Sequence, residues 1–293
     1  MKIMRKIGAS ELIINGDGSV FHLHVRPENL ADKVILVGDP GRVDLVGSFF
    51  SDIESTSSSR EFRSVTGHYR GTRMTVLSTG IGCDNIDIVM NELDALANVD
   101  FATREVRQEK RRLTILRIGT CGVVQPDIPL GAYIFSEVSA GFDGLLNWYA
   151  GRDSVVLKDA ESAFMEHAGW NRCLPVPYFV RAGESLTERF KDYAVMGMTV
   201  SAPGFYGPQC RQVRLPIVIP DLLEKIRTFG YDGLRFNNIE MEGSAIAGLS
   251  RLFGHEGATI CLGIAHRYVE NADADYKSLM EPFVEMCLDR MAE

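Results

Sequence analysis

The chain has 293 residues, of which 45% are hydrophobic and 24% are charged. This composition is typical of a globular protein and excludes disordered and fibrous classes. The formal net charge of −8 argues against broad binding to nucleic acid or to an anionic membrane, because both surfaces would repel the chain at long range. Any anion site must therefore depend on a local group of basic or N–H donors rather than on the overall charge of the protein.

The cysteines are scattered along the chain, at Cys83, Cys121, Cys173, Cys210, Cys261 and Cys287. None lies in a Cys-x-x-Cys pair or at a short spacing from histidine, so neither a disulfide framework nor a structural zinc site is expected. His22 and His24 could suggest a metal pair, but nothing supplies a third ligand. The charged start lacks a following apolar segment, and no stretch approaches the ~20 apolar residues of a membrane span. We expect a reduced, cytoplasmic protein without a metal.

Short apolar runs with turn-forming flanks predict strands, in chain order, at Lys33–Val37, Arg73–Ser78, Leu113–Ile118, Ala132–Phe135, Val195–Val200 and Ala258–Leu262. Helical periodicity and end signals predict helices at Asn85–Leu96, Asp221–Phe229, Glu242–Phe253 and Tyr276–Met291. This alternation predicts the α/β class, with a mixed, largely parallel sheet flanked by helices. No linker marks a boundary, so residues 1–293 are expected to form a single domain. The basic segment Arg104–Arg112 is interpreted as a solvated helix face rather than a binding patch.

Ligands of open α/β sheets collect just beyond the carboxyl ends of strands, and three such places carry unusual residues. The first is Gly38-Asp39-Pro40-Gly41-Arg42, which follows a predicted strand. Its glycines let the backbone approach a ligand, and Arg42 lies at a helix start, where free N–H groups favour an anion. A tight strand-to-helix turn with a surface arginine is the alternative.

The second place is Arg117, which lies in an otherwise apolar strand before the turn Gly119-Thr120-Cys121-Gly122. A guanidinium is costly to bury without an anionic partner, so something negative should meet it. That partner is either an anionic ligand or a carboxylate of the protein, and the motif does not distinguish the two.

The third place is Glu240-Met241-Glu242, just before a small-residue helix. The acids could simply cap the helix. Alternatively, a carboxylate at a sheet edge can accept two hydrogen bonds from vicinal sugar hydroxyls, while a methionine offers an apolar surface to the sugar face.

In this order, the three motifs resemble those of the nucleoside phosphorylase family, whose members split a nucleoside with inorganic phosphate into a free base and a pentose 1-phosphate. The resemblance covers most of the chain. It also includes Phe21-His22-Leu23, Ser59-Arg60-Glu61-Phe62, Ser78-Thr79-Gly80-Ile81-Gly82 and His266-Arg267.

The segment Phe205-Tyr206-Gly207-Pro208-Gln209-Cys210-Arg211 resembles the base-binding loop of uridine phosphorylases. In that loop an aromatic ring packs on the nucleoside, and Gln and Arg bind the uracil edge, which presents two carbonyl acceptors and one N–H donor. The late-strand Asp of purine phosphorylases is absent from the aligned stretch, where Ile264 and Ala265 would line a small pocket with Arg267 near the far carbonyl. The resemblance therefore implies phosphorolysis of uridine to uracil and ribose 1-phosphate.

The resemblance also implies roles for single residues. Gly38, Arg42, Arg117 and Thr120 would hold the phosphate, and Met241 and Glu242 would hold the ribose. Phe205, Gln209, Arg211 and Arg267 would surround the base. A neighbouring subunit would supply Arg60 to the phosphate and His22 to the 5′-hydroxyl, so the protein would be at least a homodimer and could be a hexamer.

The expected chemistry relies on electrostatic stabilisation by Arg117, Gln209, Arg211 and Glu242 rather than on a nucleophilic side chain. Cys121 and Cys210 lie beside the motifs but have no adjacent base in the sequence. Gly80-Ile81-Gly82 lacks the third glycine of a dinucleotide loop, so phosphate is expected as a co-substrate with no organic cofactor. A monovalent-cation site of the kind seen in some relatives, at Glu61, Ile81 and Asn85, stays open.

Departures from the family pattern leave the range of substrates open. Cys121 stands where uridine phosphorylases often have threonine, and residues 104–112 and 145–190 are longer than typical. The alternatives are a nucleosidase or a purine nucleoside phosphorylase of the same fold, or a nucleoside-binding protein without turnover. Use of deoxyuridine or thymidine is equally open.

Overall fold

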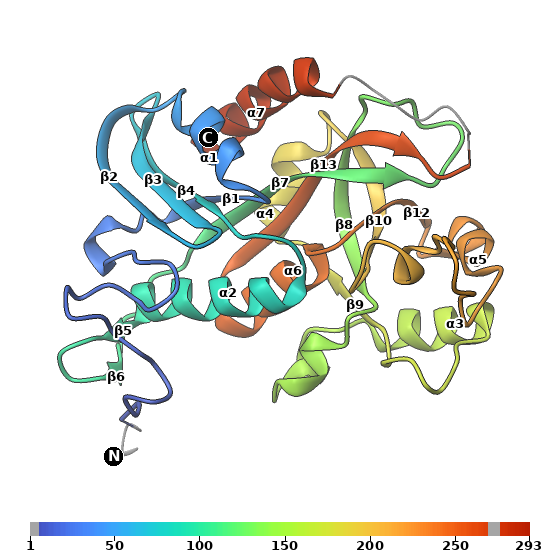
Figure 1. The fold of residues 1–293 in the computed structure, drawn as a ribbon, viewed down its shortest axis with the longest axis horizontal. Helices are drawn as coiled ribbons and strands as arrows, with labels where there is room; N and C mark the ends of the chain where they lie inside the picture. Colours follow the sequence, from blue (N-terminus) through green and yellow to red (C-terminus); the bar gives the residue numbers. More distant parts are fainter. Residues whose placement is uncertain (1–5, 269–275) are drawn as a thin grey trace.

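A computed structural model describes residues 6–268 and 276–293 and places one large mixed sheet at the centre of the molecule (Figure 1). The strand order is β11-β12-β10-β8-β13-β7-β1-β4-β3-β2, and β9 pairs with β8 outside this path. The strands are β1 Lys33–Val37, β2 Ser51–Ser59, β3 Phe62–Tyr69, β4 Thr72–Ser78, β7 Thr114–Val123, β8 Tyr133–Gly141, β9 Tyr178–Arg181, β10 Val195–Ser201, β11 Gly230–Tyr231, β12 Leu234–Glu240 and β13 Glu256–His266. A separate two-stranded sheet joins β5 Val99–Asp100 to β6 Glu105–Val106.

Helices cover both faces of the sheet. They are α1 Pro40–Gly47, α2 Cys83–Asn98, α3 Lys158–Ala168, α4 Glu184–Phe190, α5 Leu222–Thr228, α6 Gly243–Phe253 and α7 Lys277–Ala292. Helices α2 and α6 lie together on one side of β1, and α7 lies on the other (Figure 1). In β1, Val34 and Leu36 pack in the core with α2 and α6, while Ile35 and Val37 pack in the core with α1 and α7. Successive side chains of a strand point to opposite faces, so this uninterrupted apolar strand packs into a hydrophobic core on each face of the sheet.

Part of the sheet closes on itself. β7 pairs with β13 on one side, and its end also pairs antiparallel with β12, through Gly122 opposite Ile239 and Val123 opposite Asn238. Since β13, β8, β10 and β12 are neighbours in turn, the strands β7-β13-β8-β10-β12 form a closed ring. The closure brings the end of β12 beside Gly119–Gly122, a segment that was predicted as a turn but lies within β7, because it is paired with both β13 and β12.

The predicted α/β fold is confirmed, and each predicted strand and helix is present, β1 with the predicted bounds and the others with shifted ends. β7 and β8 run several residues beyond the predicted strands, to Val123 and Gly141. The elements that were not predicted are β2, β3, β5, β6, β9, β11 and β12 and the helices α3 and α4. β2 is rich in serine and mostly exposed, so it lacks the apolar run that marks a buried strand. Within the described residues, no helix is long and apolar enough to cross a membrane.

The interpretation of Arg104–Arg112 as a helix is wrong. This segment contains the short strand β6 and irregular backbone, and Arg104 has a left-handed φ of 60°. Arg104 donates to the carbonyls of Ile7, Gly8 and Leu12, so it anchors the N-terminal segment. Arg111 pairs with Asp32 and Arg112 with Glu256. These charges find partners far away in the sequence, which a helical pattern cannot reveal.

Candidate active site

A cavity of about 290 Å³ lies at the carboxyl ends of the sheet strands, where the three sequence motifs meet. The predicted site residues in its wall are Gly38, Arg42, Arg117, Thr120, Phe205, Gln209, Arg211, Met241 and Glu242. Ile264 and Ala265, the predicted apolar side of the pocket, also line it. The tertiary structure thus joins segments that are more than 200 residues apart in the sequence.

One part of the cavity wall is formed by Gly38 and Arg42, at the junction of β1 and α1. Asp39 caps α1, since its side chain accepts a hydrogen bond from the backbone N of Arg42. The same carboxylate lies 2.7 Å from Nε of Arg42. The guanidinium lies over Gly38, where a Cβ would stand 3.7 Å from an Nη atom. A helix start and a guanidinium therefore meet at this wall, and both favour an anion.

Arg117 lies in the middle of β7 and is only 5% exposed. Its guanidinium pairs with Glu242, and an Nη atom lies 3.4 Å from a carboxylate oxygen of Glu240. Burial opposes this charge, but the two carboxylates outweigh burial and hold the pKa of Arg117 above its usual value. Among the described residues Nε has no hydrogen-bond partner. Both interpretations of the motif thus have support, because Arg117 has internal carboxylate partners and also lines the cavity.

Gly119 makes room for this arginine. A Cβ at Gly119 would stand 2.0 Å from Nη1 of Arg117, far inside contact distance. Arg117 and Gly119 are two residues apart in β7, so their side-chain positions face the same side of the sheet. The glycine in the sequence motif is therefore explained by the space that the guanidinium occupies.

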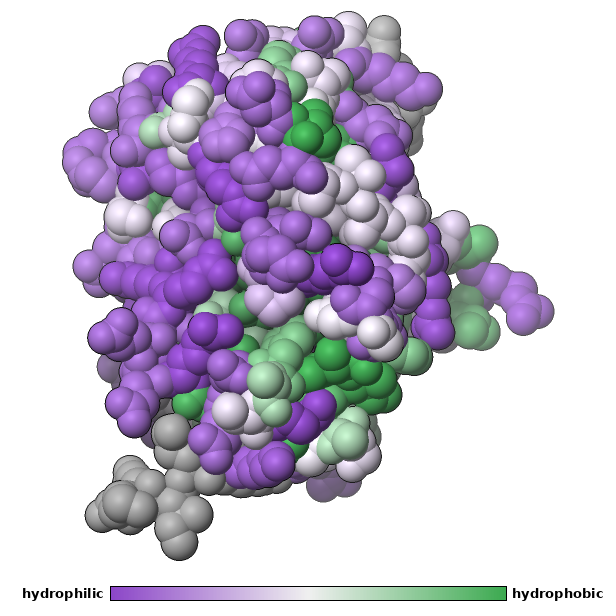
Figure 2. All heavy atoms as spheres, turned by 90° about the vertical axis from the view of Figure 1, so that its left-hand side faces the viewer, coloured by the Kyte–Doolittle hydropathy of each residue, from purple (hydrophilic) through white to green (hydrophobic). Residues whose placement is uncertain are grey.

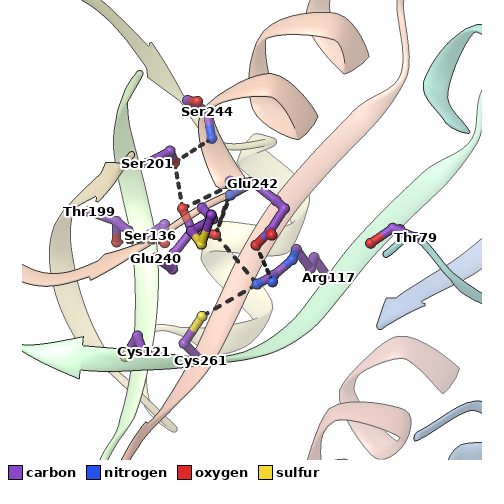
Figure 3. A network of polar contacts seen from close by, with 12 residues as sticks. Thr79, Arg117, Cys121, Ser136, Thr199, Ser201, Glu240, Glu242, Ser244 and Cys261 are labelled. Carbon is purple, nitrogen blue, oxygen red and sulfur yellow. Dashed lines mark hydrogen bonds and ion pairs between the residues drawn. The ribbon is translucent and has the colours of Figure 1, made fainter. Parts of the chain in front are cut away.

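The two acids of the third motif have different environments (Figure 3). The carboxylate of Glu240 accepts hydrogen bonds from the backbone N of Glu242 and of Gly243, at 2.9 and 2.9–3.0 Å, and from the hydroxyl of Ser201. Ser201 in turn accepts from the backbone N of Ser244 at 2.8 Å. Glu240 therefore caps α6 from the last position of β12, which is the capping alternative of the sequence analysis.

Glu242 instead binds groups at the cavity. One oxygen accepts from the backbone N of Gly82 at 2.7 Å. The other accepts from Arg117 (Figure 3). Gly82 precedes α2 with a φ of 97°, a conformation that glycine adopts without strain. Burial raises the pKa of the Glu242 carboxyl, although Arg117 opposes this shift. A buried carboxylate with defined donors is suited to bind hydroxyl groups in a fixed direction.

Another part of the cavity wall is formed by Phe205, Gln209 and Arg211. Gln209 is 3% exposed, and its side-chain oxygen accepts from Arg211 at 2.5 Å. The guanidinium of Arg211 also donates to the carbonyl of Phe205 and lies 3.8 Å from the centre of that ring. Burial, together with the nearby charge of Arg267, lowers the pKa of Arg211 to about 10. Arg211 thus orients the amide of Gln209.

Three predicted site residues lie outside the cavity wall. Arg267 donates to the backbone carbonyl of Gln209 at 2.7 Å and so supports the wall from behind. Arg60 is exposed in the turn between β2 and β3. His22 contacts the buried Glu92, with Nδ1 2.6 Å from a carboxylate oxygen. Within this chain, Arg60 and His22 therefore do not join the other predicted residues.

The structure adds residues that the sequence analysis did not assign. Asp39, Gly80, Cys121, Gly122 and Ile239 line the cavity, and the backbone of Gly82 holds Glu242. Gly80-Ile81-Gly82 before a helix was a signal for Gly82, because amides at a helix start lack partners within the helix.

Cys121 and Cys210 are thiols, and burial raises the pKa of Cys210 to about 11 and that of Cys121 above its ordinary value. Within the described part of the chain, no group of three or more His, Cys, Asp or Glu side chains is arranged to hold a metal.

The sequence and the fold were compared with those of known proteins. A uridine phosphorylase of Thermococcus kodakarensis is 26% identical over 268 residues, covering 90% of this chain and 84% of the relative. A DeoD-type purine nucleoside phosphorylase of Proteus mirabilis is 24% identical, covering 92% of this chain and 95% of the relative. The relatives therefore include enzymes for both kinds of base.

A crystal structure of a Trypanosoma brucei nucleoside phosphorylase, described as showing uridine phosphorylase activity, superposes with a TM-score of 0.88 at 29% identity. The match covers 96% of this chain and 99% of that chain. The family model described as the phosphorylase superfamily matches residues 32–293. These matches confirm the resemblance to nucleoside phosphorylases, and the chain belongs to the phosphorylase superfamily.

Proposed function

We propose that this protein catalyses the phosphorolysis of uridine to uracil and ribose 1-phosphate. One observation carries the proposal: a single cavity is lined by two arginines, a buried carboxylate and a Gln–Arg pair, the groups that phosphate, ribose and base would each require. The similarity to the Trypanosoma brucei enzyme supports the choice of uridine. Purine phosphorolysis is the second candidate, because purine phosphorylases are relatives at a comparable identity.

The phosphate would bind to Gly38, Arg42, Arg117 and Thr120, which all line the cavity. As the glycosidic bond stretches, the sugar gains oxocarbenium character, which the phosphate anion stabilises before it attacks C1′. Glu242 would hold the ribose through its hydroxyls, beside the apolar surface of Met241. Phosphate is thus the attacking group, and no side chain needs to act as a nucleophile.

The uracil gains negative charge as it leaves, and hydrogen-bond donors in the cavity would stabilise this charge. Because Arg211 engages the oxygen of Gln209, the amide nitrogen of Gln209 is left to donate to a uracil carbonyl. Phe205 would pack on the base, while Ile264 and Ala265 limit the space beyond it. A purine, with a second ring and a different edge, would leave polar groups unpaired here. The side chains themselves stabilise the leaving base, so no organic cofactor is required.

A neighbouring subunit would supply His22 and Arg60, which do not face the cavity of their own chain. The face turned to the viewer in Figure 2 carries a cluster of apolar side chains in its lower half. A second cavity of about 520 Å³ contains His22 together with Ile13 and Phe21, which are 47% and 37% exposed. Exposed apolar surface next to His22 supports a homodimer, because such patches often mark interfaces.

A base-release assay tests the proposal directly. Uridine, thymidine and inosine are each incubated with the enzyme, with and without phosphate, and the free base is quantified. We expect phosphate-dependent release of uracil and a strong preference for uridine over inosine, by a factor on the order of 10⁴ if the base site is dry. Release without phosphate would indicate a nucleosidase, tight binding without release a binding protein, and comparable inosine turnover a broader phosphorylase.

The variant Gln209→Ala tests whether Gln209 binds the base. It should lower kcat/KM for uridine by about 1–3 kcal/mol of transition-state stabilisation, because the departing uracil loses a donor. The KM for phosphate should stay near the wild-type value, since the side chain of Gln209 is paired with Arg211 rather than with Arg42 or Arg117. Unaltered uridine kinetics in this variant would contradict the pyrimidine assignment and leave the broader phosphorylase function.

A further inference from the structure

A buried polar network lies behind the cavity wall, at the backbone of Met241 and Glu242. β12 ends at Glu240 and α6 begins at Gly243, so only these two residues connect the strand to the helix. Both line the cavity. Their backbone lies outside regular secondary structure, and its position must therefore be fixed by other contacts.

The start of α2 provides two of these contacts. The thiol of Cys83, the first residue of α2, donates to the carbonyl of Met241 at 3.2 Å. The backbone N of the preceding residue, Gly82, donates to the carboxylate of Glu242 at 2.7 Å. Cys83 is 4% exposed, and burial raises the pKa of its thiol, which keeps the sulfur protonated as a donor.

The network continues away from the cavity to a buried aspartate. Sγ of Cys83 lies 3.8 Å from Oγ of Ser244, and Ser244 donates to Asp143 at 2.9 Å. The hydroxyl of Tyr178 donates to the same carboxylate at 2.8 Å and lies 3.0 Å from Oγ of Ser244. Asp143 also accepts from the backbone N of Leu145. Ser244 and Tyr178 are fully buried, so each donor depends on this carboxylate.

We propose that Cys83 and Asp143 are positioning residues of the nucleoside site, which hold the Met241–Glu242 segment against the cavity through the Met241 carbonyl and through Ser244. The inference deepens the proposed function and rests on it for the identity of the ligand. Neither residue touches the cavity itself, and neither was singled out by a sequence motif for the site. Their effect reaches the nucleoside through the backbone of Met241 and the carboxylate of Glu242.

Replacing Cys83 by alanine and by serine tests this role, with Cys287→Ala as the matched control. Cys287 is also a buried thiol, but it packs in α7 on the other side of the sheet. We expect Cys83→Ala to raise the KM for the nucleoside roughly threefold to tenfold, because the Met241 carbonyl loses its donor, while the KM for phosphate changes less than about twofold. Cys83→Ser should recover most of the loss, since a hydroxyl also donates.

Asp143→Asn is the second variant and keeps the shape of the side chain. Its NH2 group would face a donor, so Ser244 or Tyr178 would lose a partner, and the nucleoside KM should again rise more than the phosphate KM. A nucleoside KM in Cys83→Ala equal to that of wild type or Cys287→Ala, or no recovery in Cys83→Ser, would overturn the proposal.

Nucleoside binding can also be measured by calorimetry without phosphate, as the Kd for uridine in each variant. This separates the two proposals. If wild-type protein binds uridine but does not release uracil, the proposed reaction fails. A higher Kd for uridine in Cys83→Ala and Asp143→Asn than in wild type would still support the positioning role. Equal Kd values in wild type, Cys83→Ala and Asp143→Asn would remove that role whatever the reaction.

Discussion

At the scale of single residues, neighbours decide what each charged group does. Glu240 and Glu242 are two positions apart, yet Glu240 caps a helix and Glu242 points to the cavity. Arg117 binds both carboxylates, so its removal affects the fold and the site together. A test of its role must therefore separate stability from catalysis.

Arg117→Ala should lower kcat/KM by about 2–5 kcal/mol of transition-state stabilisation, because a buried charge-assisted contact to phosphate is lost. It should also destabilise the fold, since two buried carboxylates lose their cation. The double variant Arg117→Ala/Glu242→Gln should regain stability and remain inactive. Activity is measured by uracil release and stability by urea unfolding.

The control for this experiment is Arg112→Ala, which breaks an ion pair between Glu256 and an arginine side chain that is 65% exposed. Such a pair contributes ~0–1 kcal/mol, so this variant should resemble wild type in both measurements. Near-normal phosphorolysis in folded Arg117→Ala would show that Arg117 is only an internal ion-pair residue.

Acidification should reduce turnover through Glu242. Burial raises the pKa of this carboxyl, so its proton binds at a higher pH than on an exposed glutamate. The protonated form accepts fewer hydrogen bonds and no longer balances Arg117, so kcat/KM should fall as pH decreases through the raised pKa. The pH profile of kcat/KM measures this. In Glu242→Gln the residual kcat/KM should no longer fall at acid pH. If it still falls at the same pH as in wild type, another group is responsible for the titration.

At the scale of elements, the connection from β12 to α6 determines the nucleoside wall. The capping contacts of Glu240 and Ser201 end the strand and begin the helix, so Met241 and Glu242 are presented at a fixed place. Helix α2 then approaches with its N-terminus and supplies Gly82 and Cys83. The site is thus held by the ends of regular elements, which are more rigid than a free loop.

Ser201→Ala should test this junction. The change removes the acceptor of the Ser244 backbone N and a donor to Glu240, both buried, and should cost about 1–3 kcal/mol of unfolding free energy. Ser154→Ala is the control, because Ser154 is exposed and its hydroxyl donates to the nearby carbonyl of Gly151. It should change the free energy of unfolding by less than about 0.5 kcal/mol. Equal stability of the two variants in urea unfolding would argue against the capping role.

At the scale of the whole molecule, the closed ring of strands brings β7, β12 and β13 to one cavity, but His22 and Arg60 lie away from it. The proposed dimer accounts for both residues. Its two sites would each combine Glu242 of one chain with His22 and Arg60 of the other, as expected for a two-fold symmetric interface.

Mixed oligomers test this arrangement. His22→Ala and Glu242→Ala proteins should each be poorly active, but unfolding and reassembling them together should restore about one quarter of wild-type activity, because half of the dimers are mixed and one of their two sites is intact. Mixing His22→Ala with Arg60→Ala is the control and should restore no activity. One chain supplies both His22 and Arg60 to a site, so every site of a mixed dimer would lack one of the two. Mixed dimers no more active than their parents would place His22 outside the neighbouring site.

The sequence by itself determined the α/β class, most strands of the parallel core and the motifs that contain Arg42 and Arg117, because these depend on local apolar runs, helix starts and glycines. β1 and Gly38-Asp39-Pro40-Gly41-Arg42 show this, as strand and turn are next to each other in the chain. The serine-rich β2 and the basic segment 104–112 could not be predicted, since their stability comes from distant partners.

Only the tertiary structure decided how the acids and arginines are paired. Sequence pattern could not choose between an ion pair and an anion ligand for Arg117, nor between capping and binding for Glu240 and Glu242. Those choices depend on strand closure between β7 and β12, which sets the direction and distance of each side chain. The contacts of Cys83 and Asp143 behind the cavity were decided in the same way, because they join four separate segments of the chain.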